Sequence, residues 1–344
     1  MVGAAIWRPW APSFREPRDL PSLAARLQRD VPRAMRSAHV PGVAVAVVRG
    51  GEVWTRGFGT TRAGGGGAPV TERTRFQVGS LSKPVTAWGA VALTELPLDA
   101  PLTSALRPWP LPPSRFAANE ITPRRILSHT AGLDVPGYLG APPDGEGARG
   151  GAAATLASLR GQGAEGPATA VHLVDRPGAR YRYSGGGYTL LQAAIEARTG
   201  LDFAAWARRD VLAPLAMDDS AFAPLAASAT GHDAAGRPVP AYEYAELAAA
   251  GLTSDARDMA RFAAALLRRP ARLAPPQRTE SGGYALGIHV DRFDGVLRLS
   301  HEGVNRGWHA RLLAYPERGW AAVVLTNGDG GEAVADAVEA EFES

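Results

Sequence analysis

Segments that favour β-strands occur near both ends of this 344-residue chain, and the long stretch between them lacks that pattern. Residues 43–48 and 53–58 are rich in valine and aromatic residues and flank a Gly-Gly pair, which predicts a β-hairpin. Near the other end, the same reasoning predicts three strands, at residues 296–300, 309–315 and 319–326.

The stretch between these strands has helical spacing and many loop-forming residues. Strands at both ends around a helical insert predict a chain of the α/β (α+β) class with two lobes. One α/β lobe would comprise residues 1–97 and 241–344, and an all-α lobe would comprise residues 98–240.

Helices are predicted in both lobes. Apolar residues recur at helical spacing in residues 21–36, where Pro32 should kink or interrupt the helix near its end. Residues 332–342 have a similar amphipathic pattern. Within the middle stretch, helices are predicted at 123–129, 187–198 and 203–212.

Composition excludes several classes of function. There is no cysteine, so disulfides, thiol catalysis and cysteine–metal sites are ruled out. The net charge is only +3 and the arginines are scattered, which argues against a nucleic-acid partner. No apolar run approaches the roughly 18 residues of a membrane span, so no membrane association is expected. Because no secretory signal is visible at the start, we expect a cytoplasmic location.

Lys83 is the only lysine among 37 basic residues, and it lies three positions after Ser80. Arginine stays protonated in proteins, whereas a buried lysine can give up its proton and act as a base. The apolar residues 85–94 that follow predict a buried helix, and residues three apart share one face of a helix. Lys83 is therefore a candidate base, and Ser80 is the candidate nucleophile that it activates.

Two further segments carry candidate site residues. Tyr183 lies on a glycine-flanked segment that leads into a helix, where its phenol could relay protons next to a lysine and a serine; the alternative is a core aromatic residue. In His301-Glu302-Gly303, the glycine permits close approach of a substrate, and the next amide, of Val304, could be an oxyanion donor. His301 and His309 lack the i,i+4 spacing of a zinc site.

Six segments, taken in order, resemble the penicillin-recognising serine hydrolases: class C β-lactamases, D-alanyl-D-alanine peptidases and family VIII carboxylesterases. The resemblance extends over roughly residues 35 to 328 and is carried by residues 80–83, 121–133, 181–188, 212–220, 249–259 and 301–303. It implies a β-lactamase-like two-lobe fold with a central antiparallel sheet flanked by helices. The active site would lie between the lobes.

The resemblance also implies roles for individual residues. Ser80 would be the acylated nucleophile, Lys83 its base and Tyr183 the partner that takes and returns the proton. The backbone amides of Ser80 and Val304 would form the oxyanion hole. No metal or cofactor is implied. Substrate-binding positions would be His301, Gly303, Asn305, Gly185 and Trp308, with packing under the sheet as the alternative for Trp308.

Two departures from the family pattern bear on the substrate. Gly185 stands where the family has the asparagine of Tyr-x-Asn, and His301 stands where the β-lactamases have the lysine of Lys-Thr-Gly. A penicillin carboxylate would lose one cation and one amide contact, so both changes argue against efficient β-lactam hydrolysis.

We therefore expect a serine hydrolase (EC 3.1.1) whose only partner is a small-molecule ester or acyl substrate; the sequence does not determine the oligomeric state. Three enzymatic alternatives remain: an acyltransferase, a D-amino-acid peptidase or amidase, and a weak β-lactamase. From another class, a catalytically silent binding protein also remains. Among the residues with no role in the site, His129 is expected to be a hydrogen-bonded core histidine, and Asp255 and Asp258 are expected to be helix N-terminal charges.

Overall fold

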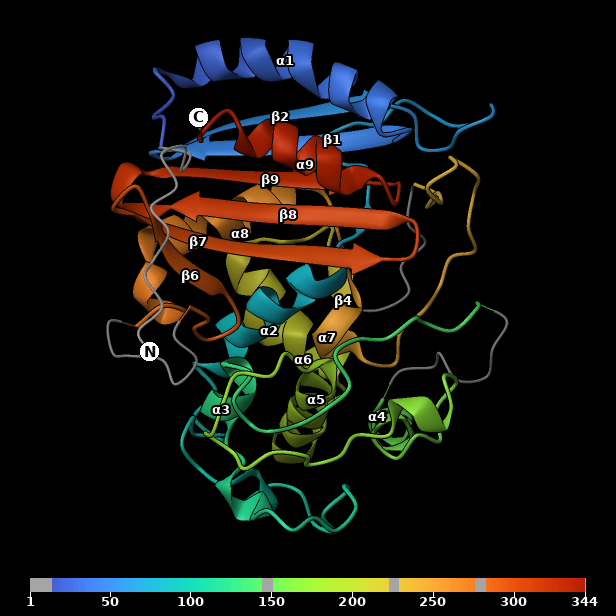
Figure 1. Ribbon diagram of the computed structural model, residues 1–344, viewed down its shortest axis with the longest axis vertical. Helices are drawn as coiled ribbons and strands as arrows, with labels where there is room; N and C mark the ends of the chain where they lie inside the picture. Colours follow the sequence, from blue (N-terminus) through green and yellow to red (C-terminus); the bar gives the residue numbers. More distant parts are fainter. Residues whose placement is uncertain (1–13, 144–150, 223–228, 276–282, 344) are drawn as a thin grey trace, which may run out of the picture.

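A six-stranded antiparallel sheet forms the centre of the upper part of the computed structural model, which describes residues 14–143, 151–222, 229–275 and 283–343 (Figure 1). The strand order is β2-β1-β9-β8-β7-β6. The bounds are β1 (Gly42–Arg49), β2 (Glu52–Gly59), β6 (His289–Phe293), β7 (Val296–Asn305), β8 (Trp308–Tyr315) and β9 (Trp320–Thr326). The predicted hairpin and the three predicted C-terminal strands are confirmed, and β6 was not predicted.

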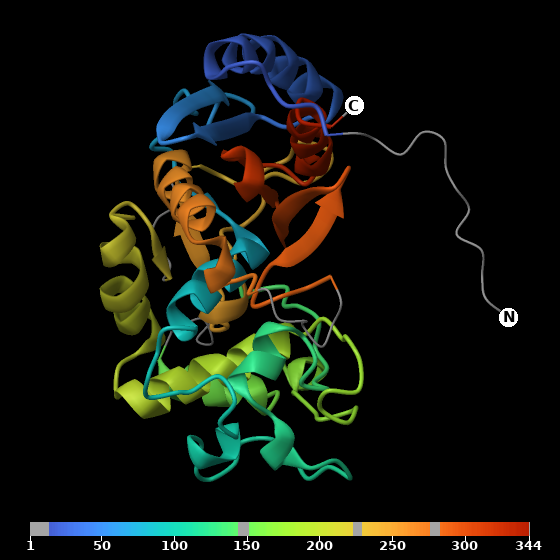
Figure 2. The ribbon, with the colours of Figure 1, turned by 90° about the vertical axis from the view of Figure 1, so that its left-hand side faces the viewer.

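The two ends of the chain meet inside this sheet, because β1 pairs with β9. Every residue of β8 and β9 is buried, as expected when helices cover both faces of a sheet. Helices α1 (Leu20–Ser37) and α9 (Gly331–Glu339) cover one face, and α8 (Ala256–Arg268) covers the other (Figures 1 and 2).

Helix α1 begins at a defined cap, where the Asp19 side chain accepts a hydrogen bond of 2.7 Å from the Ser22 amide. It continues through Pro32 to Ser37, so the interruption considered for Pro32 does not occur. Val31 and Met35, on either side of the proline, are buried against the sheet, and this packing offsets the backbone hydrogen bond that the proline cannot make.

The helical part lies below the sheet in Figure 1. It contains α3 (Pro123–Leu127), α4 (Ala152–Leu159), α5 (Gly185–Thr199) and α6 (Phe203–Ala207), and α6 passes into a π-helical turn, Arg208–Leu212. The helices predicted at 123–129, 187–198 and 203–212 are present with shifted ends, and α4 was not predicted.

Short elements join the two parts. They are a small sheet of β3 (Phe76–Gln77), β4 (Ala221–Phe222) and β5 (Leu252–Ser254), the helices α2 (Ser82–Ala90) and α7 (Leu247–Ala250), and the 3-10 turn η1 (Gly79–Leu81). One hydrophobic cluster extends from Leu312 in the sheet through Trp88 in α2 to Ile195 in α5, so the parts share a core. In the described part of the chain, no helix has the length and apolar character needed to cross a membrane.

Candidate active site

Ser80 lies in the turn η1, between strand β3 and helix α2. The turn is anchored to β5, because the Ser82 hydroxyl accepts from the Leu252 amide (2.9 Å) and donates to the Gly79 carbonyl (2.6 Å). Gly79 has a left-handed φ of +51°, and a Cβ there would lie 2.6 Å from the amide nitrogen of Val304. Only glycine permits this approach of the turn to β7.

Lys83 is 1% exposed and contacts the candidate nucleophile directly. Its Nζ lies 2.9 Å from Ser80 Oγ and donates to the Ala249 carbonyl, also at 2.9 Å. The structure therefore brings these two predicted residues together. The Ala249 carbonyl was not predicted, because a backbone acceptor has no residue-type signal.

The position of that carbonyl depends on α5. Gln192 of α5 accepts a hydrogen bond of 2.9 Å from the Ala248 amide and donates to the Ala245 carbonyl at 2.9 Å. Its buried side chain amide thus fixes helix α7, and with it the acceptor for Lys83.

The aromatic ring of Tyr183 lies beside the lysine. The Nζ of Lys83 lies 4.9 Å from the centroid of the Tyr183 ring. Tyr183 is half-buried, and it precedes the N-cap residue of α5, Ser184, whose hydroxyl accepts from the Gly187 amide at 2.8 Å. Together Ser80, Lys83 and Tyr183 form a compact group drawn from η1, α2 and the segment just before α5.

The end of strand β7 lies directly against η1. A Cβ on Gly303 would lie 1.9 Å from the Val78 carbonyl oxygen and 3.0 Å from the Ser80 amide nitrogen, so this position requires glycine. Asn305 and Trp308 flank a two-residue turn between β7 and β8, so they form a hydrogen-bonded pair of the ladder. Hydrogen-bonded and non-hydrogen-bonded pairs alternate along an antiparallel ladder, so the next pair, which contains Val304, is not hydrogen-bonded. The Val304 amide therefore points away from β8.

Strand β6 pairs with β7 only as far as Ser300. After Ser300, the edge of β7 that faces away from β8 lies next to η1 and not next to β6. This places the Val304 amide beside the turn that carries Ser80. The arrangement suits a pair of backbone donors for an oxyanion.

His301 is buried, and both of its ring nitrogens are hydrogen-bonded within the protein. Because the Glu302 carbonyl can only accept, Nδ1 carries the hydrogen and donates to it at 2.6 Å, and Nε2 accepts from the Tyr284 hydroxyl at 2.9 Å. Burial, together with the charge of Lys83, lowers the pKa of His301 to about 3. The imidazole is therefore neutral and supplies no cation.

The remaining predicted substrate-binding residues have different surroundings. Asn305 is buried and donates to the Gln77 side chain at 2.9 Å. Trp308 packs in the core, edge-on to Phe76 at 6.1 Å, and the structure does not bring it to the cleft. A Cβ on Gly185 would lie 3.2 Å from the Tyr138 ring, so residues 136–138 crowd the position where the family has asparagine. Substrate contacts of His301, Gly303, Asn305 and Gly185 remain predictions.

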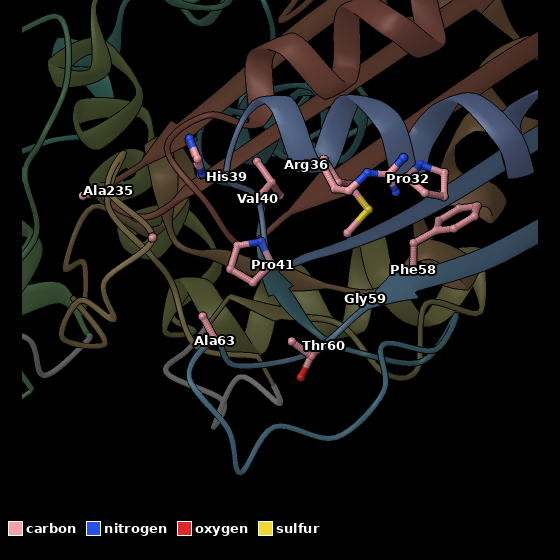
Figure 3. A pocket seen from close by; sticks show the side chains of 12 residues that line it. Pro32, Arg36, His39, Val40, Pro41, Phe58, Gly59, Thr60, Ala63 and Ala235 are labelled. Atoms are coloured by element: carbon pink, nitrogen blue, oxygen red, sulfur yellow. The ribbon is translucent and has the colours of Figure 1, made fainter.

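A pocket of about 350 Å³ adjoins this group and is lined by both Tyr183 and His301. A larger hollow of about 570 Å³, between α1 and the loop at residues 235–236, contains none of the predicted site residues (Figure 3). Of these two hollows, only the smaller is lined by predicted site residues, and its lining includes neither Ser80 nor Lys83. In the described residues, no group of three or more His, Asp or Glu side chains is arranged to hold a metal ion.

The chain is similar to several known proteins. The family model described as Beta-lactamase matches residues 27–343. An unguisins hydrolase from Aspergillus campestris is 28% identical over 330 residues, covering 84% of this chain and 59% of that protein. Esterase EstB from Burkholderia gladioli is 33% identical over 118 residues, covering 33% of this chain and 30% of that protein.

A D-aminopeptidase from Brucella ovis is 27% identical over 335 residues, covering 91% of this chain and 60% of that protein. The chain thus spans less than two thirds of the length of the curated relatives that it matches.

Solved structures show the same fold. The octameric penicillin-binding protein homologue from Pyrococcus abyssi has a TM-score of 0.73 at 23% identity, covering 92% of this chain and 76% of that one. A class C beta-lactamase has a TM-score of 0.70 at 19% identity, covering 96% and 99%. Because the family model matches nearly the whole chain, this protein belongs to the beta-lactamase family, within the penicillin-recognising serine hydrolases.

Proposed function

We propose that this serine hydrolase cleaves carboxylic esters through an acyl-enzyme on Ser80. The observation that carries the proposal is the contact of 2.9 Å between Lys83 Nζ and Ser80 Oγ, in a site where the lysine is 1% exposed. A buried amine next to a hydroxyl is the arrangement that activates a serine nucleophile.

In the first half-reaction, Lys83 takes the hydroxyl proton while Ser80 Oγ attacks the ester carbonyl carbon. The oxyanion that forms is stabilised by the backbone amides of Ser80 and Val304, and each such donor contributes about 3 kcal/mol. The Tyr183 ring centroid lies 4.9 Å from Lys83 Nζ; Tyr183 donates its phenol proton to the departing alcohol as the carbon–oxygen bond breaks, and takes up in its place the proton that Lys83 received from Ser80. The acyl group is then bonded to Ser80.

In the second half-reaction, water attacks the acyl carbonyl and gives up a proton to the Lys83–Tyr183 pair. The proton passes to Ser80 Oγ as the acyl bond breaks, and the free acid leaves. Proton transfers balance over the cycle, so no cofactor is required.

Two features favour esters over β-lactams. His301 is a neutral, buried imidazole with both nitrogens occupied, so it offers a penicillin carboxylate no cation. Gly185 offers no side chain amide, and residues 136–138 lie where a longer side chain would extend. The similarity to esterase EstB supports the same preference.

D-amino-acid peptidase or amidase activity is the second candidate. It is supported by the similarity to the D-aminopeptidase from Brucella ovis over 91% of this chain. An acyltransferase would use the same acyl-enzyme, with an alcohol or amine in place of water.

Steady-state hydrolysis of four substrates tests the ester proposal: p-nitrophenyl acetate, p-nitrophenyl butyrate, D-alanine p-nitroanilide and a chromogenic cephalosporin. We expect the highest kcat/KM with an ester, and no turnover by Ser80→Ala. A higher kcat/KM with the D-alanine anilide would replace the ester proposal with the peptidase one.

A further inference from the structure

His129 occupies a strained and almost fully buried position after helix α3. It is 2% exposed and has a left-handed backbone with φ of +56°. Few residues other than glycine adopt this conformation without cost, so surrounding contacts must hold it in place.

Those contacts are made to both neighbours of Tyr183. The His129 backbone carbonyl accepts from the Arg182 amide at 2.7 Å, and its ring Nδ1 accepts from the Ser184 amide at 3.1 Å. One residue thus binds the backbone immediately before and immediately after Tyr183. With this left-handed backbone, the carbonyl and the ring of His129 both reach the same segment.

The ring of His129 also packs on the ring of Tyr183. The two centroids are 4.2 Å apart and the planes are inclined by 39°, which is the closest of the four tyrosine contacts of His129. The backbone of Tyr183 and the orientation of its phenol ring are therefore set by the same side chain.

The hydrogen-bond pattern fixes the protonation state of His129. The Ser184 amide can only donate, so Nδ1 is unprotonated and the hydrogen is on Nε2. Nε2 is buried and has no hydrogen-bond partner among the described residues. Burial, followed by the charge of Lys83, lowers the pKa of His129 well below its usual value. A residue kept only for packing would not need this buried, unsatisfied N–H.

We propose that His129 is a positioning residue, which holds the Tyr183 phenol at the Lys83 amine by binding the backbone on both sides of Tyr183 and packing on its ring. The proposal rests on the proton-transfer role of Tyr183 in the proposed function. His129 itself is not assigned contact with the substrate.

A matched pair of amide variants tests the proposal. His129→Asn places a side chain oxygen near the position of Nδ1, where it can accept from Ser184, and asparagine tolerates the left-handed backbone. His129→Gln carries its amide one bond farther, near the position of Nε2. If His129→Gln does not fold, His129→Gly replaces it, because glycine adds no strain at φ of +56°.

Each variant is made with Tyr183 intact and in a Tyr183→Phe background, and kcat/KM with p-nitrophenyl butyrate is measured beside the melting temperature. With Tyr183 intact, we expect His129→Gln or His129→Gly to lose roughly tenfold or more, within the range of acid–base effects, and His129→Asn to recover most of that loss. In the Tyr183→Phe background, the same changes should alter kcat/KM by less than about twofold, while any loss in melting temperature persists.

Equal fold losses in both backgrounds would overturn the proposal, because His129 would then act on the fold and not through the phenol. The proposal would also be overturned if His129→Asn lost as much kcat/KM as His129→Gln or His129→Gly. If Tyr183→Phe alone has no effect on kcat/KM, it is the proposed role of Tyr183 that fails. Comparison of the wild type with Tyr183→Phe gives this result without any His129 variant.

Discussion

At the scale of single residues, the proposed chemistry depends on the difference between lysine and arginine at position 83. All the remaining lysine and arginine positions of the chain are arginines, yet the buried basic side chain beside Ser80 is a lysine. Arginine would keep a positive charge at this site but could not accept the serine proton.

We therefore predict that Lys83→Arg abolishes acylation, with a loss of roughly 10² or more in kcat/KM for p-nitrophenyl butyrate. Circular dichroism and a thermal melt check that the variant folds. A folded Lys83→Arg protein with near-wild-type turnover would exclude proton transfer by Lys83.

Tyr183→Phe removes only a hydroxyl group from the same site. We predict a loss on the order of 10² or more in kcat, because the leaving alcohol is then deprived of its proton donor. Tyr181→Phe is the matched control: this tyrosine is 39% exposed, two residues earlier, and has no assigned proton transfer. If both variants keep wild-type kcat, Tyr183 is a packing residue.

From the sequence, candidate site residues could be named where the side chain type itself suggests a role. Ser80, Lys83 and Tyr183 stand in recognisable patterns, and Asp255 was expected at a helix N-terminus, where its side chain does accept from the Asp258 amide at 2.8 Å. The Ala249 carbonyl and the support from Gln192 could not be predicted. They depend on tertiary packing between α2, α5 and α7, which no local pattern encodes.

At the scale of elements, the site depends on the close contact between η1 and β7. Gly79 and Gly303 lie on opposite sides of this contact, and neither leaves room for a Cβ. The contact sets the distance between the Ser80 and Val304 amides, so it determines whether both can reach one oxyanion.

Gly303→Ala should force these two elements apart, because the new Cβ would lie 1.9 Å from the Val78 carbonyl oxygen. We predict a loss of roughly 10²–10³ in kcat, comparable to removal of one oxyanion donor, together with a lower melting temperature. Gly328→Ala is the control, since its nearest neighbours would lie at an ordinary 3.4 Å. Full activity of a folded Gly303→Ala protein would remove the Val304 amide from the mechanism.

Helix α5 also buries a carboxyl group that the mechanism does not use. Glu196 accepts from the Phe203 amide at 3.3 Å, its second oxygen has no hydrogen-bond partner among the described residues, and burial raises its pKa to about 7. Because the folded pKa is above the usual 4.5, Glu196 contributes stability below pH 4.5 that is lost as the pH rises through 7.

Glu196→Gln keeps the acceptor and removes the charge. We predict a melting temperature close to that of the wild type at pH 5 and several degrees higher at pH 8.5, which corresponds to on the order of 2 kcal/mol. Thermal melts at the two pH values measure the difference. An equal change at both would mean that Glu196 is not buried in its charged form.

Helices and strands whose apolar residues recur with a clear period were predicted well, and those without such a pattern were not. The strands of the hairpin and the C-terminal strands have dense valine, leucine and aromatic patterns, and all five are observed. Strand β6 was missed because Asp291 and Arg292 are exposed at the edge of the sheet. Helix α6 ends earlier than expected, at Ala207, where the backbone widens into a π-helical turn that a 3.6-residue period does not predict.

At the scale of the whole molecule, the fold brings distant parts of the sequence to one point. Strand β7 from the C-terminal part contacts the turn that carries Ser80, and Tyr188 of helix α5, from the middle of the chain, has its ring centroid 5.6 Å from Lys83 Nζ. The sheet that contains β7 also contains β1, which pairs with β9. Strands from the N-terminal and the C-terminal parts of the chain therefore form the sheet next to the site. This convergence predicts one acyl-enzyme, formed on one serine.

Intact-mass spectrometry after brief exposure to p-nitrophenyl acetate and butyrate tests that claim most directly, with Ser80→Ala alongside and with or without an added amine or alcohol. We predict a single acyl adduct on Ser80 that water clears, and no adduct on Ser80→Ala. Clearance only in the presence of the added acceptor would make the protein an acyltransferase. A folded protein that forms no adduct with either donor, or forms it equally after Ser80→Ala, would contradict the account.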